Sequence, residues 1–166
     1  MRRAALLLAA ILALGLSFAA AGCGGGGGGK RLTKSEFIVK ADGICGAADK
    51  SAPKPPSDIA RVDPTSATVT DEQLNKFGDF LDDIVKHFRG ELGDLRKIKP
   101  PADLQDKWDS ALATLDEALN ELSDAADAGH NADRQKFKDK VAESDKHSKE
   151  GNKLAKELGL TVCGNG

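Results

Sequence analysis

The strongest constraint on the fold is a series of large apolar residues that recur every three or four positions between Leu74 and Ile98. This spacing places the apolar side chains on one face of a long amphipathic helix. The segment 70–73, Thr-Asp-Glu-Gln, is a capping box that marks the helix start. Three glycines lower the helix propensity of this segment, so the sequence also allows a broken or bent helix: Gly78, Gly90 and Gly93.

Three further segments of the chain have the same helical period, and none has a convincing strand pattern. Their apolar stripes run from Phe37 to Ala48, from Leu104 to Ala125 and from Phe137 to Leu158. A second capping box, 33–36, opens the first of them, and Gly159 is the expected C-terminal cap of the last. Short links between long helices favour antiparallel neighbours. The sequence therefore predicts an all-α domain, an up-down-up-down four-helix bundle with a short first helix.

The charges are nearly balanced over the chain but unevenly distributed along it. Lys and Arg number 24 against 26 Asp and Glu, so the chain lacks the basic surplus of a nucleic-acid-binding protein, and we expect no nucleic-acid partner. The third predicted helix carries mostly acids, whereas the fourth is rich in bases. These faces could pair, although each exposed pair contributes only ~0 to 1 kcal/mol, and most such charges simply face solvent.

The N-terminus has the organisation of an export signal. Arg2 and Arg3 precede an apolar segment, 4–21, and a zone of small residues follows it. Residues 20–23, Ala-Ala-Gly-Cys, resemble the bacterial lipobox, although Ala20 stands where Leu is usual. This resemblance implies that Cys23 is lipidated and becomes the mature N-terminus; plain secretion and an uncleaved membrane anchor are the alternatives.

The lipobox divides the chain into three parts. Residues 1–22 are expected to be a lipoprotein signal peptide, residues 23–30 a lipidated cysteine with a poly-glycine tether, and residues 31–166 the helical domain. Two acyl chains, such as palmitate, on Cys23 would suffice for stable membrane anchoring. The expected location is the extracytoplasmic face of the cell membrane.

Two cysteines, Cys45 and Cys163, remain once Cys23 is assigned to lipid. An even remainder in an exported chain favours one disulfide over a reactive thiol, and neither residue has the CxxC neighbour of a redox catalyst. The bridge would hold the C-terminal tail against the short first helix.

Three short motifs carry a resemblance to a known group of proteins. They are the segments 41–45 (Ala-Asp-Gly-Ile-Cys), 98–102 (Ile-Lys-Pro-Pro-Ala) and 158–164 (Leu-Gly-Leu-Thr-Val-Cys-Gly). The chain resembles small secreted or lipid-anchored proteins of high-GC actinobacteria. This resemblance implies export, helices and the disulfide, and it brings no catalytic residue. Gly43 stands where such proteins often have Ala.

No catalytic motif is present in the sequence, and we expect neither an enzyme nor a cofactor. A weaker alternative is a metal-dependent or other hydrolytic enzyme with its site near His87 and His147. Both histidines border apolar stripes at a similar predicted height in the bundle, and Asp83 and Glu143 lie one turn before them. Boundary histidines that contact solvent are the commoner meaning of this pattern.

Small residues in the fourth stripe, Ser144, Ser148 and Gly151, replace the large core residues that the period predicts. Close packing against Trp108 and the leucines of the third helix is the commoner outcome. The other outcome is a pocket for an apolar or peptide ligand. The sequence thus favours a non-enzymatic envelope lipoprotein, a binding or structural module whose partner is an envelope protein or a small apolar ligand.

Overall fold

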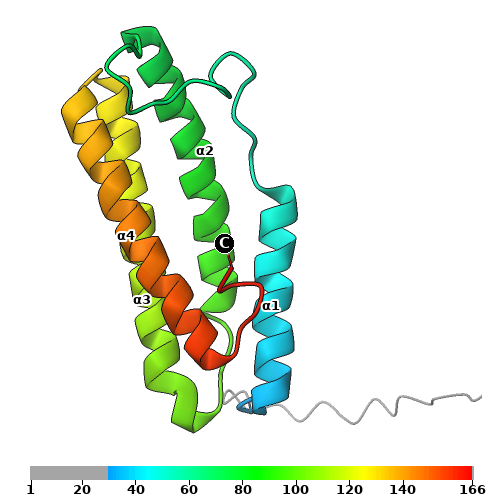
Figure 1. Cartoon of the computed structure of the whole chain (residues 1–166). Helices are drawn as coiled ribbons and strands as arrows, with labels where there is room; N and C mark the ends of the chain where they lie inside the picture. Colours follow the sequence, from blue (N-terminus) through cyan, green and yellow to red (C-terminus); the bar gives the residue numbers. More distant parts are fainter. Residues whose placement is uncertain (1–29, 166) are drawn as a thin grey trace, which may run out of the picture.

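The computed structural model is all-helical over residues 30–165, the part of the chain that it describes (Figure 1). Its elements are α1 (Lys34–Ser51), α2 (Asp71–Leu95), the short 3-10 helix η1 (Ala102–Leu104), α3 (Gln105–His130) and α4 (Arg134–Leu158). The predicted all-α class is confirmed, and no strand occurs within this range. The signal peptide, Cys23 and the glycine run lie outside the described residues.

Both predicted capping boxes form at the helix starts. The Thr33 hydroxyl accepts a hydrogen bond from the backbone N–H of Glu36 at 3.3 Å, and the Glu36 carboxylate accepts one from the Thr33 N–H at 2.8 Å. Thr70 and Gln73 make the same reciprocal pair at the start of α2. Gly159 ends α4 with φ of 90°, the left-handed conformation expected of a C-terminal cap.

Each helix packs mainly against its neighbours in the chain, and α3 has the most extensive helix contacts. It makes extensive contacts with α2 and α4, whereas α1 packs mainly against α2 (Figure 1). Between α3 and α4, Lys140 of α4 pairs with Glu121 of α3 at 2.7 Å, in the predicted sense, whereas Lys107 of α3 pairs with Glu157 of α4 at 2.6 Å, in the opposite sense. The tail after α4 crosses to α1 and joins the two outer helices.

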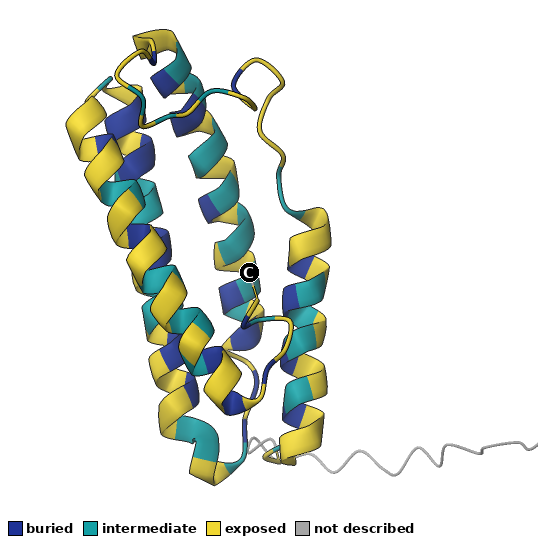
Figure 2. Cartoon of the chain, viewed as in Figure 1, coloured by how far each residue is buried: buried dark blue, intermediate teal, exposed yellow. Residues whose placement is uncertain are grey.

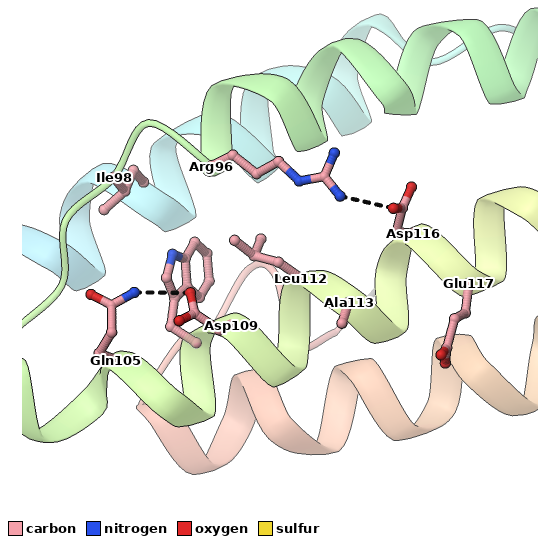
Figure 3. A pocket seen from close by; sticks show the side chains of 9 residues that line it. Arg96, Ile98, Gln105, Asp109, Leu112, Ala113, Asp116 and Glu117 are labelled. Atoms are coloured by element: carbon pink, nitrogen blue, oxygen red, sulfur yellow. Dashed lines mark hydrogen bonds and ion pairs between the residues drawn. The ribbon is translucent and has the colours of Figure 1, made fainter.

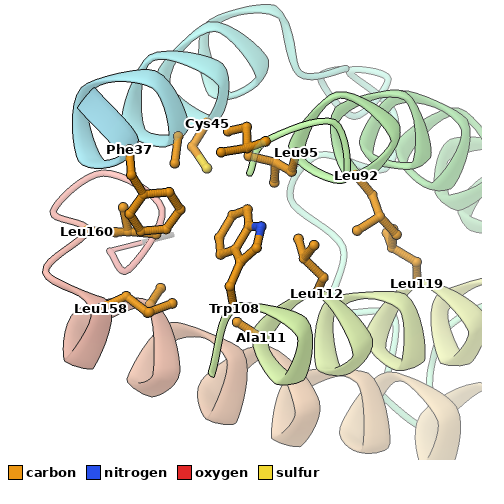
Figure 4. Close-up of a cluster of buried hydrophobic side chains, with 13 residues drawn as sticks. Phe37, Cys45, Leu92, Leu95, Trp108, Ala111, Leu112, Leu119, Leu158 and Leu160 are labelled. Atoms are coloured by element: carbon orange, nitrogen blue, oxygen red, sulfur yellow. The ribbon is translucent and has the colours of Figure 1, made fainter. Parts of the chain in front are cut away.

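The core consists of two clusters at opposite ends of the helices, and buried residues line the inward faces in Figure 2. One cluster joins α1, the tail and the adjoining ends of α2, α3 and α4. There the rings of Phe37 and Trp108 meet edge to face, with centroids 5.1 Å apart (Figure 4). The other cluster surrounds Phe77 and Phe137.

The link between α1 and α2 contributes to the second cluster, which the sequence analysis did not foresee. Ile59 and Val69 are buried in it at 1% and 4% exposure. The guanidinium of Arg134 donates to the carbonyl of Val69 at 3.0 Å and so fixes the end of the link against α4. The link is therefore a packed strap across one end of the bundle.

The C-terminal tail is fastened to α1 twice. The predicted disulfide between Cys45 and Cys163 is confirmed, with Cα atoms 5.3 Å apart. One turn before Cys45, the carboxylate of Asp42 accepts hydrogen bonds from the backbone N–H groups of Thr161 and Val162 at 2.9 Å and of Cys163 at 3.2 Å. The Thr161 hydroxyl also donates to it at 2.9 Å. Partial burial would raise the pKa of Asp42, but these four bonds outweigh it and hold the pKa below its ordinary value.

We expect Asp42→Asn to lower the free energy of unfolding at pH 7 by about 2 kcal/mol, because the amide replaces a charged acceptor shared by four donors. Since the pKa of Asp42 is lowered by folding, its contribution is present above about pH 4 and lost as the pH falls further. Urea unfolding at pH 7 and pH 3 measures this difference, with the exposed Asp103→Asn as control. Equal losses for the two variants at pH 7 would contradict the role of Asp42.

The glycines of α2 do not break the helix, which runs unbroken from Asp71 to Leu95. Gly78 lies where α2 and α3 cross closely, directly opposite Gly129. A Cβ atom at Gly129 would lie 2.8 Å from the Leu74 carbonyl oxygen and 3.1 Å from the Gly78 Cα. The two glycines therefore permit the close approach of these helices.

Candidate functional site

A groove of about 460 Å³ lies between the helices, and α1, α2, α3, α4 and the tail all contribute to its walls. Its lining is mainly apolar, and α3 supplies more of the apolar residues than any other element. The principal apolar side chains are Ile84, Phe88, Leu115, Leu119 and Leu122. This volume and lining are typical of sites that enclose small ligands.

The small residues of α4 have two different roles. Ser144 is buried, and its hydroxyl donates to the carbonyl of Ala118 at 3.0 Å, so that α4 lies close to α3 at this level. Ser148 and Gly151 line the groove. The favoured prediction, close packing against α3, is therefore found at Ser144. The alternative prediction, a pocket, is found one and two turns later, at Ser148 and Gly151.

One part of the groove wall is acidic. Glu91 of α2 and Asp49 of α1 both line it. Burial raises the pKa of Glu91 to about 7, and the negative charge of Asp49 adds to this effect, while His87 opposes it. His87 itself lies within hydrogen-bond distance, 2.9 Å, of the Ala48 carbonyl. At neutral pH the Glu91 carboxyl therefore exchanges readily between its protonated and ionised forms.

Replacing Glu91 with Gln is expected to stabilise the fold at pH 8. The folded protein retains the Glu91 proton between about pH 4.3 and 7, where the unfolded chain has lost it, so ionisation costs stability as the pH rises through this window. The gain is about 1 to 2 kcal/mol at pH 8, since solvent still reaches the carboxyl, and close to zero near pH 4. Thermal unfolding at the two pH values checks this, and a variant that is less stable than the wild type at pH 8 would refute it.

Trp108 contributes a buried polar atom to the lining of the groove. The residue is 3% exposed, and its indole Nε1 has no hydrogen-bond acceptor among the residues that the structure describes. Trp108 is also the only tryptophan of the chain. Its fluorescence is therefore a natural reporter of the groove.

A second hollow of about 400 Å³ lies between α2 and α3 (Figure 3). Four of its charged and polar side chains form two pairs: Arg96 donates to Asp116 at 2.8 Å, and Gln105 donates to Asp109 at 2.8 Å. Trp108 and Leu112 line both this hollow and the groove. These internal pairs leave fewer polar groups for a ligand than the groove offers.

The four residues of the weaker metal alternative have separate partners. His87 faces Ala48 of α1, whereas His147 Nδ1 lies 3.3 Å from the Glu117 carboxylate of α3. Glu143 pairs with Lys140 at 2.9 Å, and Asp83 is exposed. Among residues 30–165, no three His, Cys, Asp or Glu side chains are grouped so that they could hold a metal ion.

Sequence reasoning missed Glu91 and Asp49 as site residues. A signal for Glu91 was available, because it lies three positions after Phe88 and four before Leu95 and thus interrupts the apolar stripe of α2 with an acid. Asp49 carries no comparable signal, since it comes near the exposed end of α1.

The comparisons with known proteins give no match: no family model, no curated protein and no solved structure is similar to this chain. None of the helices in the described part of the chain is long and apolar enough to cross a membrane.

Proposed function

We propose that the protein is a non-enzymatic, lipid-anchored module of the cell envelope that binds a small apolar ligand in the groove. In this proposal residues 31–166 form an up-down-up-down helical bundle, and Cys23 attaches it to the extracytoplasmic face of the membrane. The observation that carries the proposal is the groove of about 460 Å³ lined mainly by apolar side chains.

The position of the small residues supports a ligand-binding role. Ser148 and Gly151 stand where the helical period of α4 predicts larger apolar residues, and both line the groove. Protein interiors are normally filled, whereas this groove leaves apolar side chains uncovered. An apolar chain that binds in it would gain free energy, because the apolar surfaces of both are removed from water.

The lipid anchor is supported by the sequence of the leader. A charged start, an apolar segment and a cysteine after small residues together favour a lipoprotein signal peptide. A domain held near the bilayer surface would meet molecules with alkyl or acyl chains, which suit the lining of the groove.

A ligand titration with a matched pair of variants tests the binding site. We expect decanol to change Trp108 fluorescence in a saturable way, and Ser148→Leu to weaken its binding about 10-fold because the larger side chain occupies the groove. Ser110→Leu places the same substitution on the exposed face of α3, outside the groove, and should leave the binding unchanged.

Two results would contradict the proposal. One is the absence of saturable decanol binding by the folded wild-type domain. The other is equal binding by the wild type and by Ser148→Leu, with circular dichroism showing that both are folded.

A further inference from the structure

We propose that the ligand of the groove is a cationic amphiphile, an alkyl or acyl chain with an ammonium head group that lies beside Glu91 and Asp49. This inference rests on the proposed function and adds the chemical class of the ligand. The preference for a cation follows from the ion pairs of the groove: its basic side chains lie beside acids, whereas Glu91 and Asp49 have no Lys or Arg beside them.

The basic groups along the groove already have acidic partners. Lys149 of α4 pairs with Asp145 one turn earlier at 2.5 Å, and His147 lies beside Glu117. Both Lys149 and His147 line the groove. Each of these two basic groups therefore already has a carboxylate beside it.

The acids on the opposite wall have no such partner. Within the described part of the chain, no Lys or Arg lies within 4.0 Å of the Glu91 or the Asp49 carboxylate, because none of the ion pairs includes either residue. Both carboxylates line the same apolar groove. Two neighbouring acids from different helices thus form a region of negative potential, which His87 only partly offsets.

Burial makes this region selective for cations. An anionic head group would add a third negative charge next to the partly buried Glu91 carboxylate and the exposed Asp49 carboxylate, which is unfavourable. An ammonium group can donate to both carboxylates and replace the water that they lose. The apolar chain would then extend over Phe88, Leu115 and Leu119, which line the same groove.

The protonation of Glu91 gives the inference a second signature. The carboxyl is flanked by Asp49 of α1 and His87 of α2, while Asp145, His147 and Lys149 of α4 line the same groove. An ammonium group binds the ionised carboxylate, so its binding should release a proton and tighten between pH 5 and pH 8. Binding of a neutral chain should lack this release.

The test compares three ten-carbon ligands by isothermal titration calorimetry at pH 8, each below its micelle-forming concentration. We expect decylammonium to bind about 10-fold more tightly than decanol, and decanoate to bind at least 10-fold more weakly than decanol. In Glu91→Gln the ratio of the decylammonium affinity to the decanol affinity should fall several-fold. Glu150→Gln, an exposed site on α4 outside the groove lining, should behave as the wild type.

The outcomes separate this inference from the proposed function. Two results would refute the cationic ligand but leave the proposed apolar binding site intact. One is that decanol binds while decanoate binds as tightly as decylammonium, and the other is that Glu91→Gln retains the full preference for decylammonium. If none of the three ligands binds, both the inference and the proposed function are wrong.

Discussion

Replacing Cys45 and Cys163 together with alanine lowers the free energy of unfolding by about 4 kcal/mol, the largest effect that we expect of any change in this domain. The bridge joins residues 118 positions apart and thereby removes much of the conformational freedom of the unfolded chain. It also holds the tail on α1, a helix whose other contacts are mainly with α2. Urea unfolding of the wild type and the double variant measures the loss.

Reducing agent provides the control for this prediction. Dithiothreitol should lower the stability of the wild type toward that of the double variant and leave the double variant unchanged. The four hydrogen bonds to Asp42 are independent of the bridge, so the reduced protein should remain helical by circular dichroism. A double variant as stable as the oxidised wild type would show that the bridge is dispensable.

Replacing Gly129 with alanine should destabilise the protein by about 2 to 3 kcal/mol. The new Cβ atom would meet the backbone of α2 at Leu74 and Gly78, and a backbone contact cannot be relieved by a change of rotamer. The helices must separate locally, which loosens the cluster around Phe77 and Phe137. Thermal unfolding at neutral pH measures this loss.

Gly90→Ala is the matched control for Gly129→Ala. A Cβ atom at Gly90 meets no atom within 4 Å, and the residue is exposed in the interior of α2. The substitution should therefore stabilise the protein by about 0.5 to 1 kcal/mol through helix propensity. Opposite signs for the two variants support the close helix crossing; a neutral Gly129→Ala would contradict it.

The helices could be predicted because their signals are local. The apolar stripe from Leu74 to Ile98, the two capping boxes and the cap at Gly159 depend on residues within a few positions of one another. The disulfide could also be predicted, because only two cysteines, Cys45 and Cys163, remain once Cys23 is assigned to lipid. These features depend on which residues occur near one another in the chain, and the structure agrees with them.

The features that sequence reasoning missed depend on contacts between distant residues. Asp42 has the same side chain as many exposed acids, and only the fold places Thr161 and Val162 within its reach. The link before α2 is polar and proline-containing, yet two of its apolar residues, Ile59 and Val69, are covered by the ends of the helices. The burial of these two residues depends on the path of the link across the helices, and no periodic pattern in the sequence predicts that path.

The groove could be predicted only as an alternative. Ser144, Ser148 and Gly151 have the same small volume, and the sequence does not tell which of them lies against a neighbouring helix. The packing of the helices decides it: Ser144 donates to the Ala118 carbonyl, whereas Ser148 and Gly151 line the groove. The acidic wall of Glu91 and Asp49 likewise depends on the docking of α1 against α2.

The most direct test of the central claim, that the groove is a ligand-binding site, is a map of backbone amide chemical shifts during a decanol titration. Our account predicts saturable changes at groove residues of α2, α3 and α4, such as Phe88, Leu119 and Ser148, and none around Phe77 and Phe137. Changes confined to the cluster around Phe77 and Phe137, or changes scattered without saturation, would contradict it.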